Sequence, residues 1–562
     1  MERSVCALPH RVIFLLFTCI FVSSSTSYQN NTDVDALLYF KNSISGDLSS
    51  WNESLHYCQW PGVVCGNSKH SVGRRVTSLQ LNSFNLTGSI SPYLANLTFL
   101  RHLSLSGNNF SGSIPEEFGR LFQLRHLNLS QNSLQGTIPS SLGACSNLRN
   151  ISLANNELQG ALPRNLSYCT YLQNIDLKSN KLEGEIPAEF GSLQGLKLLV
   201  LGINNLRGSI PSSFGNFSLL TVLDLSYNDL SGSIPSKLGS LPSLTSLNLS
   251  NNNLEGSLPS SLWNFSSLMY LNLGLNKLSG TLPKDIGHLL PNLRFISLST
   301  NQFHGTIPAS LSNASSLESV ALDSNGFTGK IPASLGTLPR MYNLKLVYNH
   351  LEAKEEADWS FMNALTNNTV LKKLELSCNE FEGLLPNSLV NLSKGLEVLS
   401  MGYSKLSGSI PEGIGNLVGL SVIIMGPNLF TGSIPSSIGK LKNLHILALD
   451  FNHLSGRIPH SIGNLTQLYR LFLESNQLSG SIPSTIGNCQ QMEYITLSDN
   501  NLNEEAENDA RNMEFRGATR DFLVSVIRIG LLCSKESPME RMQMGDVTKE
   551  MLAIRDSFLL GF

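Results

Sequence analysis

The chain is poor in charged residues. Lys, Arg, Asp and Glu make up 14% of its 562 residues, and the formal net charge is −3. A nucleic-acid scaffold would need a basic face, and an acidic interaction tail would need a run of carboxylates, so the composition argues against both. Helical patterning is also scarce before residue 521, where short units spaced by Leu and punctuated by Asn take its place.

The apolar stretch near the N-terminus is too short to cross a membrane. Arg3 and Arg11 precede the run Val12–Val22, and small residues follow at 23–27. A spanning helix needs about 20 apolar residues. A basic start, a short apolar core and a small-residue exit are typical of a secretory signal peptide, which we expect over residues 1–27. We therefore expect a secreted, extracellular product.

Acceptor sites of the form Asn-x-Ser/Thr recur along the whole chain. Each site alone is a weak signal, but together they suit a glycosylated ectodomain. We expect glycans at Asn52, Asn85, Asn96, Asn109, Asn128, Asn150, Asn165, Asn216, Asn248, Asn264, Asn313, Asn367, Asn391 and Asn464.

Residues that could carry catalysis are few and scattered. His102, His126, His445 and His453 form no visible nucleophile–base set, so no catalytic, cofactor or metal site is expected. His102 and His126 fall on equivalent exposed strand positions, where they would form a solvated ladder.

A 24-residue period dominates the chain. The unit LxxLxLxxNxLxGxIPxxLGxLxx restarts at Leu124, Leu148, Leu172 and onward, and marks a leucine-rich-repeat array. The alternating Leu pair predicts one half-buried strand per repeat, stacked into a parallel sheet. The Asn of the unit would use its buried amide to bond backbone groups of the neighbouring turn.

These features predict an α/β solenoid. It would be a right-handed superhelix with a concave parallel sheet, a helical N-terminal cap and a short C-terminal helical segment. We expect a cap over 28–75, about 17 full repeats and one partial repeat over 76–502 with an insertion at 351–371, a polar linker over 503–520, and helices over 521–562.

The cysteines have different expected fates. Cys58 and Cys65 follow a cap helix that we expect over 32–45, and they are close enough in sequence to pair in an oxidising compartment. Metal binding is a poor rival, because no further Cys or His lies at ligand spacing. Cys145, Cys169 and Cys489 replace a core Leu, which favours buried free thiols, with a Cys145–Cys169 bridge as the alternative.

The signal peptide, the W-C-x-W-x-G-V-x-C cap and the LxGxIP repeats together resemble plant leucine-rich-repeat receptor-like serine/threonine kinases over residues 1–502. The insertion is similar to an element of the class that includes the flagellin and elongation-factor receptors. Asn368 stands where that element has Cys, which creates the acceptor site at Asn367. Residues 521–562 resemble the last helices of the family's kinase domain.

The resemblance implies recognition without catalysis. The Gly-rich phosphate loop, the strand Lys, the His-Arg-Asp loop and the Asp-Phe-Gly motif of the family are missing, so we expect no enzyme. We expect a peptide or microbial protein ligand on the concave face, in immunity or development, and a co-receptor kinase near the C-terminal repeats. Alternatives are a secreted inhibitor of a microbial cell-wall-degrading enzyme, or a soluble decoy of a full-length plasma-membrane receptor.

The later repeats are the expected ligand site. In the early repeats, some acceptor sites fall on strands, whereas from Leu268 onward they fall elsewhere and exposed strand positions become aromatic or apolar. Exposed aromatic residues with a few placed charges are typical of interface anchors. The alternative is that these rings only stack along the sheet. The predicted site is Phe295, Tyr342, Lys345, Val347, Tyr348, Tyr403, Ile424, Asp450, Phe451, Tyr469, Phe472 and Glu474.

Overall fold

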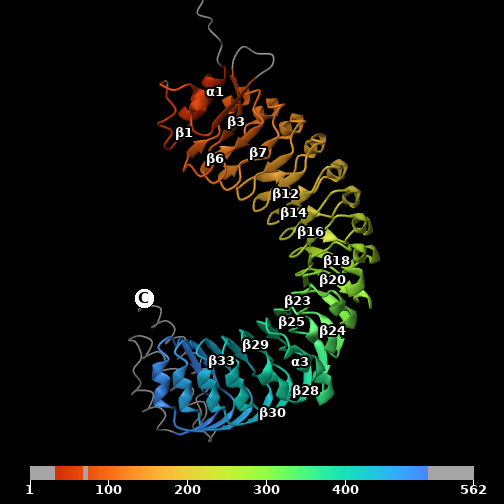
Figure 1. The fold of residues 1–562 in the computed structure, drawn as a ribbon, viewed down its shortest axis with the longest axis vertical. Coiled ribbons are helices and arrows are strands. Elements are labelled where there is room, and N and C mark those ends of the chain that lie inside the picture. The colour runs from red at the N-terminus through yellow and green to blue at the C-terminus, as the bar shows by residue number, and fades with distance from the viewer. Residues whose placement is uncertain (1–31, 53, 68–73, 504–562) are drawn as a thin grey trace, which may run out of the picture.

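The computed structural model describes residues 32–52, 54–67 and 74–503. These residues form one open, curved array of repeats (Figure 1). The expected signal peptide, the linker beyond residue 503 and the C-terminal helices lie outside the described residues. Within the described residues, the expected leucine-rich-repeat solenoid, with its concave parallel sheet and helical N-terminal cap, is confirmed.

The concave sheet receives one short strand from each repeat. The strands pair in parallel and in register, so that Leu223 lies beside Leu247 and Leu247 beside Leu271. β2 (Val63–Asn67) closes the N-terminal edge antiparallel to β3. The strands are β3 (Arg74–Gln80), β5 (His102–Ser104), β7 (His126–Asn128), β9 (Asn150–Ser152), β11 (Asn174–Asp176), β13 (Leu198–Val200), β15 (Val222–Asp224), β17 (Ser246–Asn248), β19 (Tyr270–Asn272), β21 (Phe295–Ser297), β23 (Ser319–Ala321), β25 (Asn343–Lys345), β27 (Lys373–Glu375), β29 (Val398–Ser400), β31 (Val422–Ile424), β33 (Ile446–Ala448), β35 (Arg470–Phe472) and β37 (Tyr494–Thr496).

A second set of strands runs along the flank of the array. The prediction of one strand per repeat was wrong, because the segment after the Asn of the repeat unit also pairs with the same segment of the neighbouring repeats. The central Leu of this segment is buried and its neighbours are polar. A single apolar residue among polar ones is also typical of a turn, so the sequence pattern did not indicate a strand. The strands are β1 (Ile44–Ser45), β4 (Thr87–Ser89), β6 (Asn109–Ser113), β8 (Ser133–Gln135), β10 (Gln159–Ala161), β12 (Lys181–Glu185), β14 (Asn205–Gly208), β16 (Asp229–Gly232), β18 (Asn253–Ser257), β20 (Lys277–Gly280), β22 (Gln302–Thr306), β24 (Gly326–Gly329), β26 (His350–Ala353), β28 (Glu380–Leu384), β30 (Lys405–Ser409), β32 (Leu429–Gly432), β34 (His453–Gly456), β36 (Gln477–Gly480) and β38 (Asn501–Leu502).

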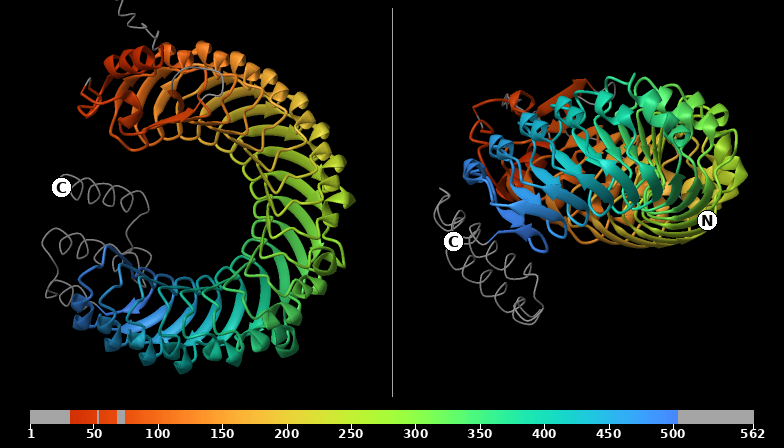
Figure 2. Two further views of the ribbon diagram at one scale, coloured as in Figure 1. Left: turned by 45° about the horizontal axis from the view of Figure 1, so that its top comes forward. Right: turned by 90° about the horizontal axis from the view of Figure 1, so that it is seen from below.

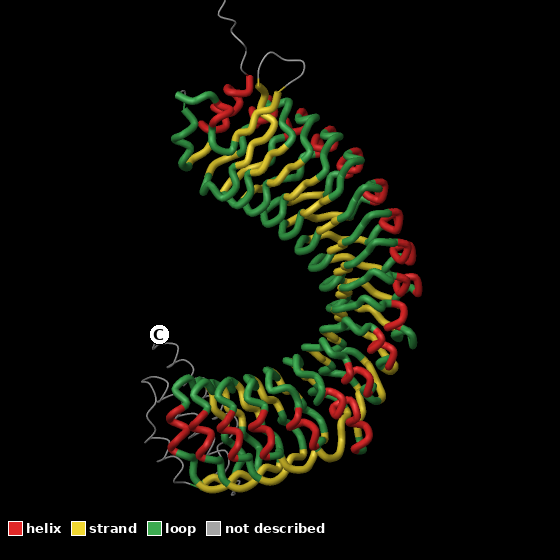
Figure 3. Tube along the Cα trace, in the orientation of Figure 1, coloured by secondary structure: helices red, strands yellow, loops and turns green. Residues whose placement is uncertain are grey.

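Short helices form the outer side of the arc (Figure 3). Most follow the Pro of the Ile-Pro pair, whose fixed φ suits a helix start. The following Gly allows close stacking, since a Cβ on Gly215 would lie 2.2 Å from the carbonyl oxygen of Lys237. The helices are α1 (Thr32–Asn42), η1 (Tyr57–Gln59), η2 (Pro92–Asn96), η3 (Glu116–Arg120), η4 (Ser140–Ala144), η5 (Arg164–Tyr168), η6 (Ala188–Ser192), η7 (Ser212–Asn216), η8 (Ser236–Ser240), η9 (Ser260–Asn264), α2 (Ile286–Leu289), η10 (Ala309–Asn313), η11 (Ala333–Thr337), η12 (Glu356–Trp359), α3 (Ser360–Leu365), η13 (Asn387–Asn391), η14 (Glu412–Asn416), η15 (Ser436–Lys440), η16 (His460–Asn464) and η17 (Ser484–Asn488).

The Asn of each unit joins successive turns, as predicted. Asn228 is buried, and its Nδ2 donates at 3.1 Å to the carbonyl oxygens of Leu201 in the preceding turn and Leu225 in its own. Its Oδ1 accepts from the backbone N–H of Leu206 at 3.0 Å. The amide therefore satisfies backbone groups of two turns at once. A ladder of such residues runs through the array.

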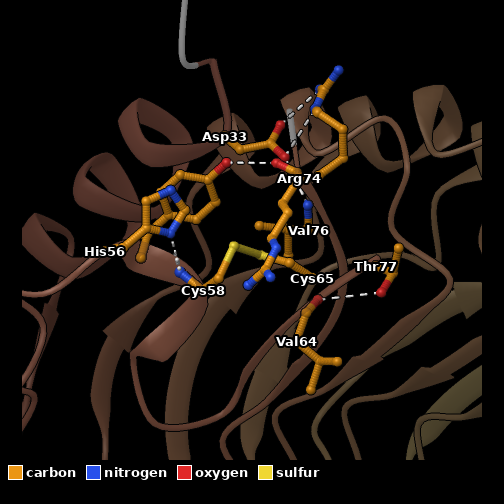
Figure 4. Close-up of a disulfide and its surroundings, with 10 residues drawn as sticks. Asp33, His56, Cys58, Val64, Cys65, Arg74, Val76 and Thr77 are labelled. Atoms are coloured by element: carbon orange, nitrogen blue, oxygen red, sulfur yellow. Dashed lines mark hydrogen bonds and ion pairs between the residues drawn. A yellow bond between two sulfur atoms is a disulfide. The ribbon is translucent and has the colours of Figure 1, made fainter. Parts of the chain in front are cut away.

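The N-terminal cap covers the first repeat (Figure 4). Helix α1 brings Asp33 to full burial, where its carboxylate accepts from the Arg75 guanidinium at 2.7 Å and from the Val76 N–H at 2.8 Å. A disulfide joins Cys58 to Cys65, with Cα atoms 5.5 Å apart. Helix, ion pair and disulfide together seal the edge that the first strand would otherwise expose.

The insertion after β26 adds η12 and α3 to the outer side. Asn368 follows α3 and is buried, and its Nδ2 donates to the carbonyl oxygens of Leu338 and Met341 at 3.0 and 2.8 Å. The amide thus has a structural role at the position where the resembling element has Cys. The neighbouring acceptor Asn367 is exposed.

The remaining described cysteines are free. Cys145, Cys169 and Cys489 are buried, as predicted, and no bridge joins Cys145 to Cys169. Burial raises the pKa of the Cys145 thiol to about 12 and that of Cys169 to about 11, so both stay protonated and inert.

Candidate ligand-binding face

The inner side of the arc is lined by the concave strands (Figure 2). In each three-residue strand the middle side chain is buried in the core, and the first and third face outward. In β19, for example, Leu271 is buried, whereas Tyr270 and Asn272 remain partly accessible. The outward positions therefore form columns that run from repeat to repeat along the concave face.

A further column lies in the turn just after each strand. Nearly every repeat has a positive φ there, between 49° and 58° for its non-Gly residues from Gln131 onward. This left-handed conformation favours Gly, Asn and Asp, and it is unusual for bulky or β-branched residues. Asn155, Asn251 and Asp499 follow that preference.

Six repeats place a large apolar side chain in this left-handed position. We call these residues the apolar ridge, and all of them are exposed: Ile203 (43%), Tyr227 (50%), Leu275 (46%), Tyr348 (62%), Tyr403 (60%) and Phe451 (51%). Exposure means that the ridge contributes little to the core, and the backbone conformation makes each residue costlier than Asn or Gly would be. The requirements of the fold do not explain this choice of residues.

The predicted site residues divide between the strands and the turns that follow them. Tyr348, Tyr403 and Phe451 were expected on strands, and this was wrong: they lie in the left-handed turn position, three residues after the ends of β25, β29 and β33. The prediction also missed Ile203, Tyr227 and Leu275. Their shared offset from the strand Leu pair was a usable signal, but its meaning depends on the backbone φ.

The other predicted residues lie on or beside the strands. Phe295, Lys345, Ile424 and Phe472 are strand residues of β21, β25, β31 and β35. Tyr342 and Tyr469 come directly before β25 and β35, and Val347, Asp450 and Glu474 lie two residues after β25, β33 and β35.

Several predicted rings contact neighbours along the sheet. Phe295 stacks on Tyr270 with ring centroids 4.5 Å apart, Phe472 lies 5.4 Å from Tyr494, and Tyr469 meets His445 edge-on at 6.3 Å. These rings match the stacking alternative. Among the described residues no such ring pair involves an aromatic residue of the apolar ridge, so the ridge is the more available part of the face.

Some charged groups on the later repeats are neutralised within the protein, either by an ion pair or by a raised pKa. Lys345 forms an ion pair with Asp323 at 3.2 Å. Burial raises the pKa of the Asp450 carboxyl, and it raises the pKa of Glu474 to about 7, with Asp450 and Asp499 adding to the effect. The Thr496 hydroxyl donates to Glu474. This end of the face therefore carries less negative charge near neutral pH than its sequence indicates.

Nine of the expected acceptor sites for glycans fall into two structural groups. Six are the exposed last residues of outer helices: Asn96, Asn216, Asn264, Asn313, Asn391 and Asn464. By contrast, Asn128, Asn150 and Asn248 lie on concave strands and are half-buried. Asn150 already bonds along the sheet, because its Oδ1 accepts from Asn174 Nδ2 at 2.8 Å. A glycan on an outer helix would leave the concave face open.

The early repeats present histidines in place of the later apolar residues. His102 and His126 were expected to be solvated, but they are half-buried and stack with ring centroids 4.6 Å apart. Burial is the main cause that lowers the pKa of both imidazoles, and nearby arginines add to it. Both are neutral at neutral pH.

Two kinds of site do not occur in the part of the chain that the structure describes. No group of three His, Cys, Asp or Glu side chains there could hold a metal ion. No helix there is long and apolar enough to span a bilayer.

The repeat frame, the capped N-terminus and the open concave face define a leucine-rich-repeat protein. The sequence family described as Leucine rich repeat N-terminal domain matches residues 30–66. Leucine-rich-repeat families match residues 170–254 and eight single repeats: 99–121, 123–145, 267–289, 292–314, 370–392, 395–417, 443–465 and 467–489.

Among solved structures, the Arabidopsis receptor kinase HAESA in complex with the peptide hormone IDA and the co-receptor SERK1 is 33% identical, with a TM-score of 0.62, and the match covers 84% of this chain and 90% of that chain. The plant peptide hormone receptor RGFR1 in complex with RGF2 is 31% identical, with a TM-score of 0.68 and coverage of 82% of each chain. The chain belongs to the family of plant leucine-rich-repeat receptor kinases, and the shared part is the ectodomain.

Curated relatives match over shorter stretches. The LRR receptor-like serine/threonine-protein kinase EFR of Arabidopsis thaliana is 42% identical over 110 residues, which is 19% of this chain and 10% of the relative. The receptor kinase-like protein Xa21 of Oryza sativa subsp. japonica is 44% identical over 83 residues, 14% of this chain and 8% of the relative. The matches therefore span a tenth or less of these relatives.

Proposed function

We propose that this chain is a recognition module that binds a peptide or protein ligand on its concave face. The apolar ridge carries the proposal. Each left-handed residue other than Gly costs about 1–2 kcal/mol, so bulky side chains there oppose folding stability. Residues that are kept in a costly conformation and yet remain exposed are typical of functional sites.

The solved relatives support a ligand of this kind. HAESA was solved in complex with the peptide hormone IDA, and the plant peptide hormone receptor RGFR1 in complex with RGF2. The HAESA complex also contains the co-receptor SERK1, and we propose that a similar co-receptor docks near the C-terminal repeats of this chain. We propose binding, not phosphotransfer, as the activity of this chain, in immune or developmental signalling.

We further propose an extracellular location. The Cys58–Cys65 disulfide suits an oxidising compartment. The acceptor sites at the ends of the outer helices are exposed, as glycosylation requires. Protein recovered from the culture medium of expressing plant cells should shift to lower mass on deglycosidase treatment. Recovery from the cytosol without any such shift would contradict this location.

Alanine substitution of the ridge tests the binding proposal. A random-peptide library displayed on phage would be panned against the unmodified protein, and the recovered peptides would be measured by calorimetry. In the variant with Tyr348→Ala, Tyr403→Ala and Phe451→Ala, affinity should fall by about 100-fold or more, because exposed aromatic anchors dominate binding energy. The melting temperature should stay close to that of the parent.

Tyr168→Ala is the matched control. Tyr168 is 68% exposed but ends the outer helix η5, away from the concave face. Its substitution should leave peptide affinity unchanged. If the recovered peptides bind the ridge variant as well as the parent, or if Tyr168→Ala weakens them equally, the concave ridge is not the ligand site.

A further inference from the structure

Three arginines occupy one position on successive repeats near the N-terminus. Arg101, Arg125 and Arg149 come directly before β5, β7 and β9, and we call them the arginine row. The backbone N–H of Arg125 donates to the Arg101 carbonyl at 2.8 Å, and Arg149 donates to Arg125 at the same distance. Neighbouring strands lie about 4.8 Å apart, so the three side chains start from adjacent steps of the sheet.

The same position elsewhere carries charges that are paired. Arg294 lies 2.6 Å from Glu318 on the next repeat, and Lys372 lies 2.7 Å from Glu397. Among the described residues no carboxylate is within ion-pair distance of the arginine row. Like charges on neighbouring strands destabilise a sheet, so the row opposes folding stability.

The repeat frame does not require a cation at this position. Thr221 and Thr245 occupy it in later repeats, where they bond to the preceding backbone carbonyl at 2.9 and 3.0 Å. Lys197 continues the positive charge one repeat beyond Gln173. Within the part of the chain that the structure describes, the fold neither needs nor neutralises this row of guanidinium groups, so the row is available to an anionic ligand.

The column beside the row consists of two imidazoles and an amide, those of His102, His126 and Asn150. The neighbouring column holds the His102–His126 stack, and His126 Nδ1 lies 2.7 Å from the Asn150 amide. The imidazoles are half-buried, neutral and flat, and they form a platform beside the row. A ligand segment on this platform would meet several guanidinium groups at once.

We infer that the arginine row binds an acidic segment of a peptide ligand, with Asp or Glu carboxylates on the guanidinium groups. The inference rests on the proposed function, since it concerns the same ligand. Guanidinium groups bind carboxylates through two parallel hydrogen bonds, and several carboxylates are needed to engage three of them. A peptide fits better than an acidic polysaccharide because the apolar ridge begins at Ile203, in the same repeat as Lys197. Apolar side chains that follow an acidic segment would contact it.

A labelled oligoglutamate peptide tests this inference by fluorescence anisotropy, with oligoglutamine as the uncharged comparison. All proteins carry Ser130→Ala and Ser152→Ala, which remove the acceptor sites at Asn128 and Asn150 on the concave strands beside the row. The parent should bind oligoglutamate and not oligoglutamine, more weakly as salt rises. Arg101→Gln with Arg125→Gln and Arg149→Gln should weaken binding by about tenfold or more.

Arg294→Gln is the matched control, because it removes a paired arginine from the same position of a later repeat. It should leave oligoglutamate binding unchanged. Arg125→Lys keeps the charge but loses the planar guanidinium group that donates two parallel hydrogen bonds. Its oligoglutamate affinity should therefore lie between those of the parent and the triple variant. Since the triple variant relieves repulsion, its melting temperature should equal or exceed that of the parent.

The inference is overturned if the parent fails to bind oligoglutamate at low salt, or if Arg294→Gln weakens binding as much as the triple variant. It is also overturned if polygalacturonate binds the row and displaces the peptide completely at equal charge. The ridge variant separates the two proposals. It should keep oligoglutamate affinity, so loss of ridge binding and loss of row binding are independent results.

Discussion

The two ends of the concave sheet share one interior and differ in how burial acts on their outward groups. At the N-terminal end, burial lowers the pKa of His102 and His126. At the C-terminal end, it raises the pKa of Asp450 and Glu474. In both places the same desolvation suppresses charge, on bases at one end and on acids at the other. The repeat therefore determines the position of each outward side chain, and the burial of that position determines whether the side chain is ionised.

The largest expected difference between the ends comes from the cap. Replacing Cys58 and Cys65 by Ser should destabilise the N-terminal repeats by about 2–4 kcal/mol. Each repeat contacts only its neighbours, so hydrogen exchange should accelerate in β3 and β5 and stay unchanged in β33. Cys378→Ser, which removes a free and partly exposed thiol, is the control. A uniform acceleration along the whole array would show that the repeats do not act locally.

The Asn ladder should behave alike at both ends. Asn228→Leu and Asn452→Leu each leave buried backbone groups unpaired, at a cost of about 1–3 kcal/mol in the free energy of unfolding. Asn452 has the same bonds as Asn228, including one from Phe430 N–H to its Oδ1 at 3.0 Å. Denaturant unfolding measures both costs, with the exposed Asn205→Ala as the control. A cost in only one half would disprove a uniform frame.

Glu474 should make the C-terminal repeats weaker at high pH. Its folded pKa of about 7 lies above the ordinary value of 4.5, so the folded state holds the proton more tightly. The stabilisation is complete below pH 4.5 and is lost as the pH rises through 7. Hydrogen exchange in β35 should accelerate over this range, and Glu474→Gln should remove the dependence. An unchanged pH profile in that variant would assign the effect to another group.

The smallest expected effect has the opposite sign and lies at the other end. The pKa values of His102 and His126 are lowered below 6.5, so the unfolded chain binds protons more readily. The N-terminal repeats should therefore lose stability as the pH falls below 6.5. His126→Asn, which copies Asn150 and Asn174 of the same column, should flatten this response in β7. A steeper response would contradict the assignment.

Much of the fold could be predicted because the interior repeats with strict spacing. The Leu pair before Asn228 and the Asn228 amide have the same structural role in every repeat. The fold of one repeat therefore predicts the fold of the others. The second strand was missed because the segment around Leu254 alternates a single apolar residue with polar ones, which also describes a turn. Pairing there depends on the neighbouring repeat, which a local pattern does not contain.

The candidate site was only partly predictable, for a conformational reason. Phe451 and Phe472 look alike in sequence as exposed aromatic residues near a strand. The backbone separates them, because Phe451 has a φ of 49° and is exposed, whereas Phe472 ends β35 and packs near Tyr494. Ile203 was overlooked because its offset from the strand Leu pair gains a meaning only when the left-handed φ at that position is known.

The Asn ladder also allows the number of repeats in the array to change during evolution. The side-chain amide of Asn228 bonds to its own turn and to the turn before it, at offsets of 2, 3, 22 and 27 residues. Unequal recombination that removes or duplicates one whole turn would leave every other bond intact. The distance between the arginine row and the apolar ridge can then change only in steps of one strand spacing, about 4.8 Å. The length of peptide that contacts both surfaces would then change in steps of one repeat, and a protein with a repeat duplicated between them would bind a longer peptide.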